Sequence, residues 1–91
     1  MKKETQIWKY TLTGIENEIE VPLGARFLYI NEQYRKINVW AEVDPKQPKG
    51  IRILEVFGTG HPIEEAERRY LGSCKLHDGR FVFHVFERFD N

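Results

Sequence analysis

Hydrophobic and polar residues alternate with a period of two along most of this 91-residue chain. In the segment IWKYTL, Trp8, Tyr10 and Leu12 share one side, and Lys9 and Thr11 share the other. Because successive side chains of a β-strand point to opposite faces, this alternation predicts strands. The same pattern recurs in further segments, which are residues 18–23, 26–31, 36–43, 51–58, 70–77 and 80–87.

The dipeptide Asp78-Gly79 predicts a tight hairpin turn between the last two of these segments. Both central residues of a type I′ turn need positive φ, which Asp and Gly tolerate. A two-residue turn also fixes the strand register. The register expected from it pairs Leu76 with Phe81, Lys75 with Val82, Cys74 with Phe83, Ser73 with His84, Gly72 with Val85 and Leu71 with Phe86.

The segments between the strands predict loops and at most a turn or two of helix. Residues 44–50 combine two prolines with charges and are typical of a loop. Pro62 suits a first helical position and Glu64 suits the positive end, so one short helix or 3₁₀ turn is expected near 62–69. Six or seven short strands predict a mainly β fold, a compact antiparallel barrel or sandwich that forms a single domain over residues 1–91.

The composition indicates which classes of binding partner and which cellular compartment are expected. Lys and Arg total 14, as do Asp and Glu, so the formal net charge is zero. A dedicated nucleic-acid binder usually carries a basic excess, and weak mutual repulsion favours self-association. The single cysteine, Cys74, excludes an internal disulfide. With no secretory h-region and no run of about 18 apolar residues, a cytoplasmic protein is expected.

The glycine-containing stretch FGTGH, residues 57–61, has two interpretations. It lacks the lysine of a P-loop and the third glycine of a dinucleotide fingerprint, so a bend at a strand end is favoured. In the alternative, a nucleotide or other small ligand is held by the loop, with Trp40 or His84 nearby. The residues that would form this anion-binding nest are Gly58, Thr59, Gly60 and His61.

Little in the sequence predicts catalysis. The three histidines, His61, His77 and His84, lack the helical spacing of a metal-binding pair. Cys74 is expected to face the core opposite Phe83, where burial raises the pKa of a thiol and makes it inert. The chain is therefore expected not to be an enzyme and to need neither a cofactor nor a metal ion.

Basic residues stand next to aromatic ones in two places, at Tyr34 to Lys36 near Trp40 and at Arg68 to Tyr70. Aromatic rings beside cations are how nucleotides and single strands are held. Acidic residues are interleaved with both groups, so solvated loop faces explain them equally well. Dedicated nucleic-acid binding is not expected.

Two strands are apolar on both faces. In IRILEVF, Ile51, Ile53 and Phe57 lie opposite Leu54 and Val56. In RFVFHVFE, Phe81, Phe83 and Val85 line one side, whereas the other side carries Val82, His84 and Phe86. Trp40 adds a large aromatic on the polar side of its strand. Either the chain covers these second faces itself, with the loop 44–50 and the short helix, or they form a surface for self-association or a partner protein.

Several spaced blocks carry a resemblance that spans nearly the whole chain. They are KYTL, VPLGARFL, VWAEVDP, FGTGHPI, YLGS and GRFVFHVFE. These blocks resemble a family of short uncharacterised proteins of tailed bacteriophages and prophages. The resemblance implies an intracellular protein made during infection that acts stoichiometrically on a host enzyme, a defence protein or a signalling nucleotide. It assigns no catalytic or binding residue.

The function expected is that of a phage-type small accessory protein, a non-enzymatic binding domain that forms a homodimer and binds an unidentified host or phage protein. A module that sequesters a nucleotide or other small ligand is the alternative, and a structural or assembly factor is a third. The candidate binding residues are Trp40, Gly58, Thr59, Gly60, His61, Val82, His84 and Phe86.

Overall fold

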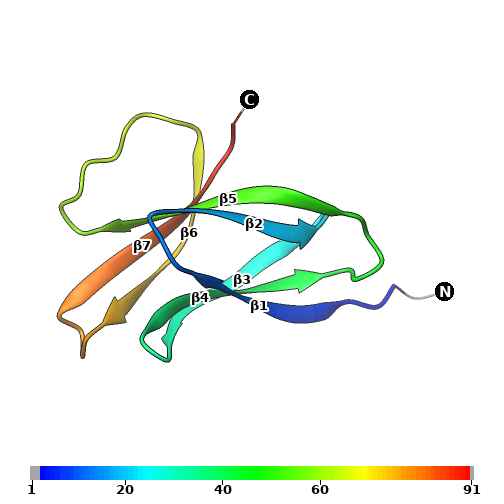
Figure 1. The fold of residues 1–91 in the computed structure, drawn as a ribbon, viewed down its shortest axis with the longest axis horizontal. Helices are drawn as coiled ribbons and strands as arrows, with labels where there is room; N and C mark the ends of the chain where they lie inside the picture. Colours follow the sequence, from blue (N-terminus) through cyan, green and yellow to red (C-terminus); the bar gives the residue numbers. More distant parts are fainter. Residues whose placement is uncertain (1–2, 91) are drawn as a thin grey trace.

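A computed structural model describes residues 3–90, which form strands and connecting loops without a helix. The strands are β1 (Gln6–Leu12), β2 (Glu16–Pro22), β3 (Arg26–Gln33), β4 (Lys36–Val43), β5 (Lys49–Gly58), β6 (Arg68–Leu76) and β7 (Phe81–Arg88). They pair antiparallel in two sheets with the orders β1-β4-β3 and β2-β5-β7-β6. Figure 1 shows the sheets as two layers, so the prediction of a mainly β fold is confirmed as a sandwich rather than a closed barrel.

The core lies between the sheets and follows the period of two. In β4, the four alternate residues from Ile37 to Val43 all point inward and are buried. Leu54 and Val85 face them from the second sheet with no exposed surface. At one side the sheets meet where Ile30 of β3 packs on Gly72 of β6. A Cβ at that glycine would lie 3.0 Å from the Ile30 Cγ1, so the close approach requires a residue without a side chain.

The β6–β7 hairpin has the predicted turn. Asp78 and Gly79 have φ values of 56° and 86°, and the Arg80 amide donates to the His77 carbonyl over 3.1 Å. Positive φ at both central residues is what a type I′ turn requires, and His77 before them also has a positive φ, 54°. Five of the expected cross-strand pairs are therefore confirmed, from Leu76–Phe81 to Gly72–Val85.

The expected pair of Leu71 with Phe86 is wrong. The register shifts between Tyr70 and Gly72, so Tyr70 stands opposite Phe86. A β-bulge inserts one extra residue and moves every later side chain to the other face. The close packing of Gly72 on the first sheet is a tertiary contact that the hairpin sequence does not contain.

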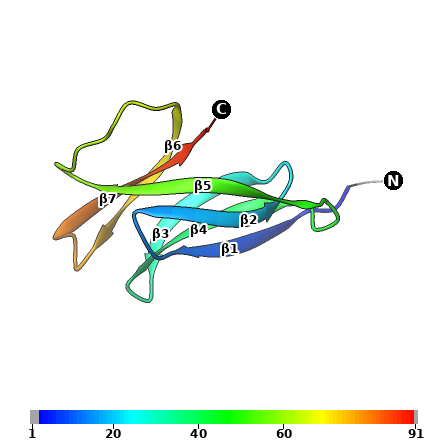
Figure 2. The ribbon, with the colours of Figure 1, turned by 45° about the horizontal axis from the view of Figure 1, so that its top comes forward.

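The helix or 3₁₀ turn expected near 62–69 is absent, and residues 59–67 form an irregular loop. This stretch is acidic and its largest apolar residue, Ile63, is half exposed. A short helix without an apolar face to bury is not stable. The loop arches over the end of β5 and β6 in Figure 2, so this loop, not residues 44–50, lies next to the outer face of the second sheet.

Candidate binding sites

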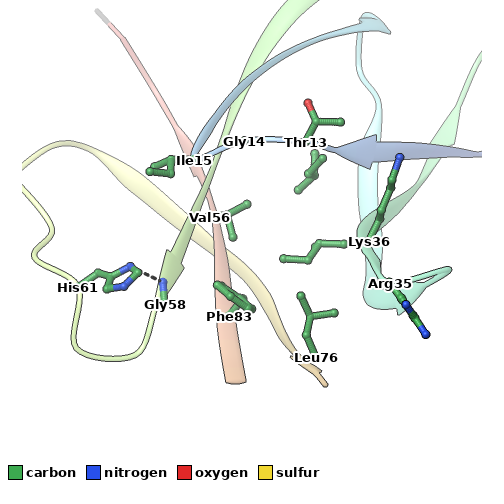
Figure 3. A pocket seen from close by; sticks show the side chains of 12 residues that line it. Thr13, Gly14, Ile15, Arg35, Lys36, Val56, Gly58, His61, Leu76 and Phe83 are labelled. Atoms are coloured by element: carbon green, nitrogen blue, oxygen red, sulfur yellow. Dashed lines mark hydrogen bonds between the residues drawn. The ribbon is translucent and has the colours of Figure 1, made fainter. Parts of the chain in front are cut away.

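The two sheets separate at one end of the sandwich and leave an open cavity of about 520 Å³. It lies between the β1–β2 loop, the β3–β4 turn, the end of β5 and the β6–β7 hairpin. Figure 3 shows its apolar side chains pointing toward one another across the opening. These walls are formed by Leu12, Ile15, Ile37, Val56, Leu76 and Phe83.

The rim of this cavity is basic. His61 stands at one side, and Arg35 and Lys36 stand at the other (Figure 3). None of the described residues that line the cavity carries a carboxylate. An apolar interior with convergent polar groups at its mouth is the usual form of a small-ligand site.

His61 is fixed at the rim by the bend that the FGTGH stretch forms. The Gly58 amide donates to His61 Nδ1 over 3.2 Å, and the His61 amide donates to the Gly58 carbonyl over 3.1 Å. The ring lies so close that a Cβ on Gly58 would be 2.8 Å from its Cε1. Gly60 has a φ of 91°, which a residue with a Cβ rarely adopts. Both glycines are therefore explained by the turn.

The loop amides that would form an anion-binding nest are mostly bonded within the chain. Besides the two bonds above, the Thr59 amide donates to the Val82 carbonyl over 3.3 Å. These bonds favour the interpretation of Gly58 to His61 as a bend. Two of its residues, Gly58 and His61, nevertheless line the cavity.

Arg35 reaches the rim through a strained turn. Gln33 pairs with Lys36, so Tyr34 and Arg35 are the two central residues of a hairpin turn, with φ values of 56° and 64°. Such turns normally contain Asn or Gly, because other side chains disfavour positive φ. The sequence predicts a loop here but not its geometry.

A chain of hydrogen bonds crosses the outer face of the second sheet. Thr59 Oγ1 lies 2.9 Å from His84 Nε2, and His84 Nδ1 lies 2.8 Å from Ser73 Oγ. Ser73 in turn lies 2.7 Å from the Tyr70 hydroxyl. Both imidazole nitrogens face hydroxyls, so the arrangement lacks the carboxylate that orients the base of a catalytic triad. The bonds connect the start of the loop 59–67 to the sheet.

The same outer face is partly covered. Val82 and Phe86 are half-buried, and the Phe86 ring makes edge contacts with Phe57 and Tyr70. The carboxylate of Glu55 is buried beside them and accepts hydrogen bonds from two arginines.

One of these arginines, Arg88, also bonds Glu16 and Asp90. Hydrogen bonds to Asp90 and Glu16 raise the pKa of the Arg88 guanidinium above its ordinary value. The other, Arg68, lies over the Phe57 ring. The second apolar face of β7 is therefore partly used by the chain itself.

Trp40 lies on the outer face of the other sheet, β1-β4-β3, together with Tyr29 and Ile7. The Trp40 and Tyr29 rings are 5.4 Å apart, and Ile7 and Tyr29 are 62% and 56% exposed. Hydrogen bonds from Thr5 and Arg26 lower the pKa of Glu42 on this face. Trp40 therefore does not share a site with the loop at Gly58 to His61. Of the two residues expected as alternatives beside this loop, His84 lies there, with its Nε2 2.9 Å from Thr59 Oγ1.

Cys74 faces the core opposite Phe83, as predicted, and burial raises the pKa of its thiol. Among residues 3–90, no three His, Cys, Asp or Glu side chains cluster closely enough to hold a metal ion. None of these residues forms a helix of the length and hydrophobicity that crosses a membrane.

Sequence analysis missed most of the cavity. Its walls come from five strands and a loop, and each wall residue on a strand has the alternation of an ordinary core residue. The available signal was Ile15, an isoleucine in the β1–β2 loop that is 71% exposed. A single exposed apolar residue is common on protein surfaces, so this signal does not by itself indicate a binding site.

These surfaces belong to a small antiparallel β-sandwich with an open cavity at one end. Residues 3–91 match the model of a family described as a domain of unknown function, DUF7352, and the chain belongs to this family. No curated protein and no solved structure shows a significant match to the chain. The expected membership in an uncharacterised family is confirmed, and a phage origin stays a prediction.

Proposed function

We propose that this protein is a non-enzymatic binding domain that acts by associating with protein chains, first with a second copy of itself. The observation that carries the proposal is the free edge of β1 beside an exposed apolar strip. On the outer face of the first sheet, Trp40 stands opposite Tyr29, and Ile7 of the edge strand lies diagonally from Trp40. Lys9 and Glu42 lie beside them on the same face. Exposed apolar groups of this kind mark association surfaces.

The edge of β1 is less protected than the corresponding edge of the second sheet. β1 pairs with β4 alone within its sheet and carries a single charged residue, Lys9. The edge strand β2 instead carries three glutamates and a terminal proline, Pro22. Charges and prolines are the devices by which proteins prevent strand addition at an edge. β1 has only one of them, Lys9, and no proline, which leaves its edge more open to addition of a strand from another chain.

Two copies joined along β1 would form one six-stranded sheet with a twofold axis. The two Trp40–Tyr29 pairs would then lie on one continuous face, which enlarges the surface available to a further partner. Homodimers with self-complementary interfaces of this kind are the commonest oligomers.

The biological setting belongs to the same proposal. The protein acts stoichiometrically in the cytoplasm of an infected cell, as a phage-encoded accessory protein that binds a host or phage protein, such as a defence protein. The resemblance of the spaced sequence blocks to phage proteins supports this part. Reading the neighbouring genes of family members tests it, and neighbours without phage genes would contradict it.

Light scattering coupled to size-exclusion chromatography tests the association. The wild-type protein is expected to elute with the mass of a dimer, and Ile7→Glu with the mass of a monomer, because a buried charge opposes the contact. Ile51→Glu is the matched control, since Ile51 is 59% exposed on the outer face of the second sheet. A specific dimer should form at a concentration of ~100 μM. A wild-type protein that is still monomeric there, or equal masses of the two variants, would overturn the proposal.

A second candidate function is sequestration of a small ligand, which the cavity between the sheets favours. Its walls are apolar and its rim is basic, as described above. A thermal-shift screen is its first test, because a ligand that binds the folded chain raises its melting temperature.

A further inference from the structure

We infer that the cavity at the open end of the sandwich binds a small amphipathic carboxylate, a molecule with an unbranched apolar tail and one negative charge. The inference rests on the second candidate function and names its ligand class. A cavity of about 520 Å³ falls within the ~300–1,000 Å³ typical of ligand pockets. The requirements on the two ends of the ligand follow from different residues.

The side chains that form the cavity walls determine that the tail of the ligand is apolar. Val56, Leu76 and Phe83 of the second sheet face Leu12 and Ile37 of the first across the opening. No polar side chain points between them in Figure 3. A polar base or sugar would lose hydrogen bonds to water there without replacement, whereas an alkyl chain gains about 25 cal/mol per Å² of buried surface.

The rim determines the head group. Arg35 and Lys36 make no ion pair in the part of the chain that the structure describes, whereas Arg52, Arg68 and Arg88 each bind a buried or partly buried carboxylate. An unpaired guanidinium at the mouth of an acid-free cavity fits a carboxylate, which it can hold with two parallel hydrogen bonds.

His61 supplies a further donor at the opposite side of the mouth. Because its Nδ1 accepts a hydrogen bond from the Gly58 amide, the neutral ring carries its proton on Nε2. This N–H is therefore free to donate to an oxygen of a ligand. Its position on a bend that requires two glycines keeps the ring at the rim.

The strain at Tyr34 and Arg35 supports the same assignment. An Asn-Gly turn would relieve it, yet this chain has a bulky residue and a cation at the two positions with positive φ. Strained backbone is found where a side chain has a role other than stability. Here one of the two strained residues, Arg35, lines the rim of the cavity.

A single charge is favoured over a phosphate-bearing ligand. Glu32 and Asp78 line an adjacent hollow that shares Arg35 and Leu76 with the cavity. They would repel a group with two or more negative charges. The amides of Gly58, Thr59 and His61, which could have held a phosphate, are bonded within the chain.

The test is a titration of the whole protein followed by amide NMR shifts. The probes are sodium decanoate below its micelle concentration, 1-decanol as the uncharged match, and AMP. Decanoate is expected to shift amides around Ile15, Val56 and Leu76, with weaker shifts from decanol and none from AMP. In Arg35→Gln/Lys36→Gln the decanoate affinity is expected to fall about tenfold, the effect of losing a charge-assisted hydrogen bond.

Lys46→Gln/Lys49→Gln is the matched control, because it makes the same change in net charge near the β4–β5 loop, at the other end of the sandwich (Figure 1). Its decanoate affinity is expected to equal that of the wild type. Equal affinity of decanoate and decanol, or no loss in Arg35→Gln/Lys36→Gln, would overturn the carboxylate assignment while leaving a small-ligand function. Absence of shifts with all three probes would overturn both the carboxylate assignment and the small-ligand function. Shifts of the same amides on dilution without a probe would also overturn both, because they would show that a second copy of the chain occupies the cavity.

Discussion

The hydroxyl of Tyr10 is a buried polar group that lowers the stability of the fold. Its ring packs against the core from β1, and among residues 3–90 the buried oxygen finds no hydrogen-bond partner. Burial raises the pKa of this phenol. A buried polar atom without a partner loses its hydrogen bonds to water without replacement.

Tyr10→Phe is therefore expected to raise the free energy of unfolding by about 1 kcal/mol. Urea denaturation followed by tryptophan fluorescence measures it. Tyr29→Phe is the control, because the Tyr29 hydroxyl is exposed and bonded to Asn31, and its effect should stay within about 0.5 kcal/mol. A loss of stability in Tyr10→Phe would show that the hydroxyl has a partner in solution.

At the scale of the element, two hairpin turns that both have positive φ at their two central residues differ in sequence. The β6–β7 turn has Asp78-Gly79 at its centre, which the sequence predicts directly. The β3–β4 turn has Tyr34-Arg35 in a similar conformation, which no propensity predicts. In the second case the pairing of the flanking strands, fixed by the buried residues of β4, imposes the turn.

Tyr34→Asn/Arg35→Gly is expected to raise the free energy of unfolding by about 1–3 kcal/mol, since a side chain in the left-handed region costs ~1–2 kcal/mol per residue. Thermal and urea denaturation measure this change. Tyr34→Phe/Arg35→Lys keeps the strain and should show no gain. If the Asn-Gly variant is no more stable than the wild type, the turn is not strained in solution.

At the scale of the molecule, the open cavity contrasts with a buried ion pair elsewhere between the sheets. Glu87 is 3% exposed and accepts two hydrogen bonds from the Arg52 guanidinium, at 2.6 and 2.7 Å. Arg52 also stacks on the Phe27 ring, 4.4 Å from its centre, and donates to the Ala25 carbonyl. These contacts join β3, β5 and β7, so the pair connects the two sheets.

Arg52→Met is expected to lower the free energy of unfolding by about 3–5 kcal/mol, because it leaves the Glu87 carboxylate buried without its partner. Arg26→Met is the control: its pair with Glu42 is exposed, and such pairs contribute about 0–1 kcal/mol. Adding Glu87→Leu to Arg52→Met should restore much of the loss, since no charge is then left buried. Equal effects of the two single variants would contradict this account.

The alternation of residue types was enough to predict the strands, and the Asp78-Gly79 turn was enough to predict most of the pairing of the last two. In β4 the buried hydrophobic residues are those that the period of two selects, and in the last hairpin Asp78-Gly79 set five of six predicted pairs. These features depend on neighbours along the chain or directly across a tight turn, so the sequence by itself determined them. The burial of Cys74 followed from the same register.

The candidate sites were decided by the tertiary structure. The bulge at Gly72 depends on Ile30 of the other sheet, and the loop 59–67 has too little apolar surface to form the expected helix. The cavity forms because two sheets diverge at one end, which is a property of how layers pack and not of any strand. Residues such as Val56 and Leu76 have the same local pattern as core residues, and only the packing of the second layer determines which of them line a cavity.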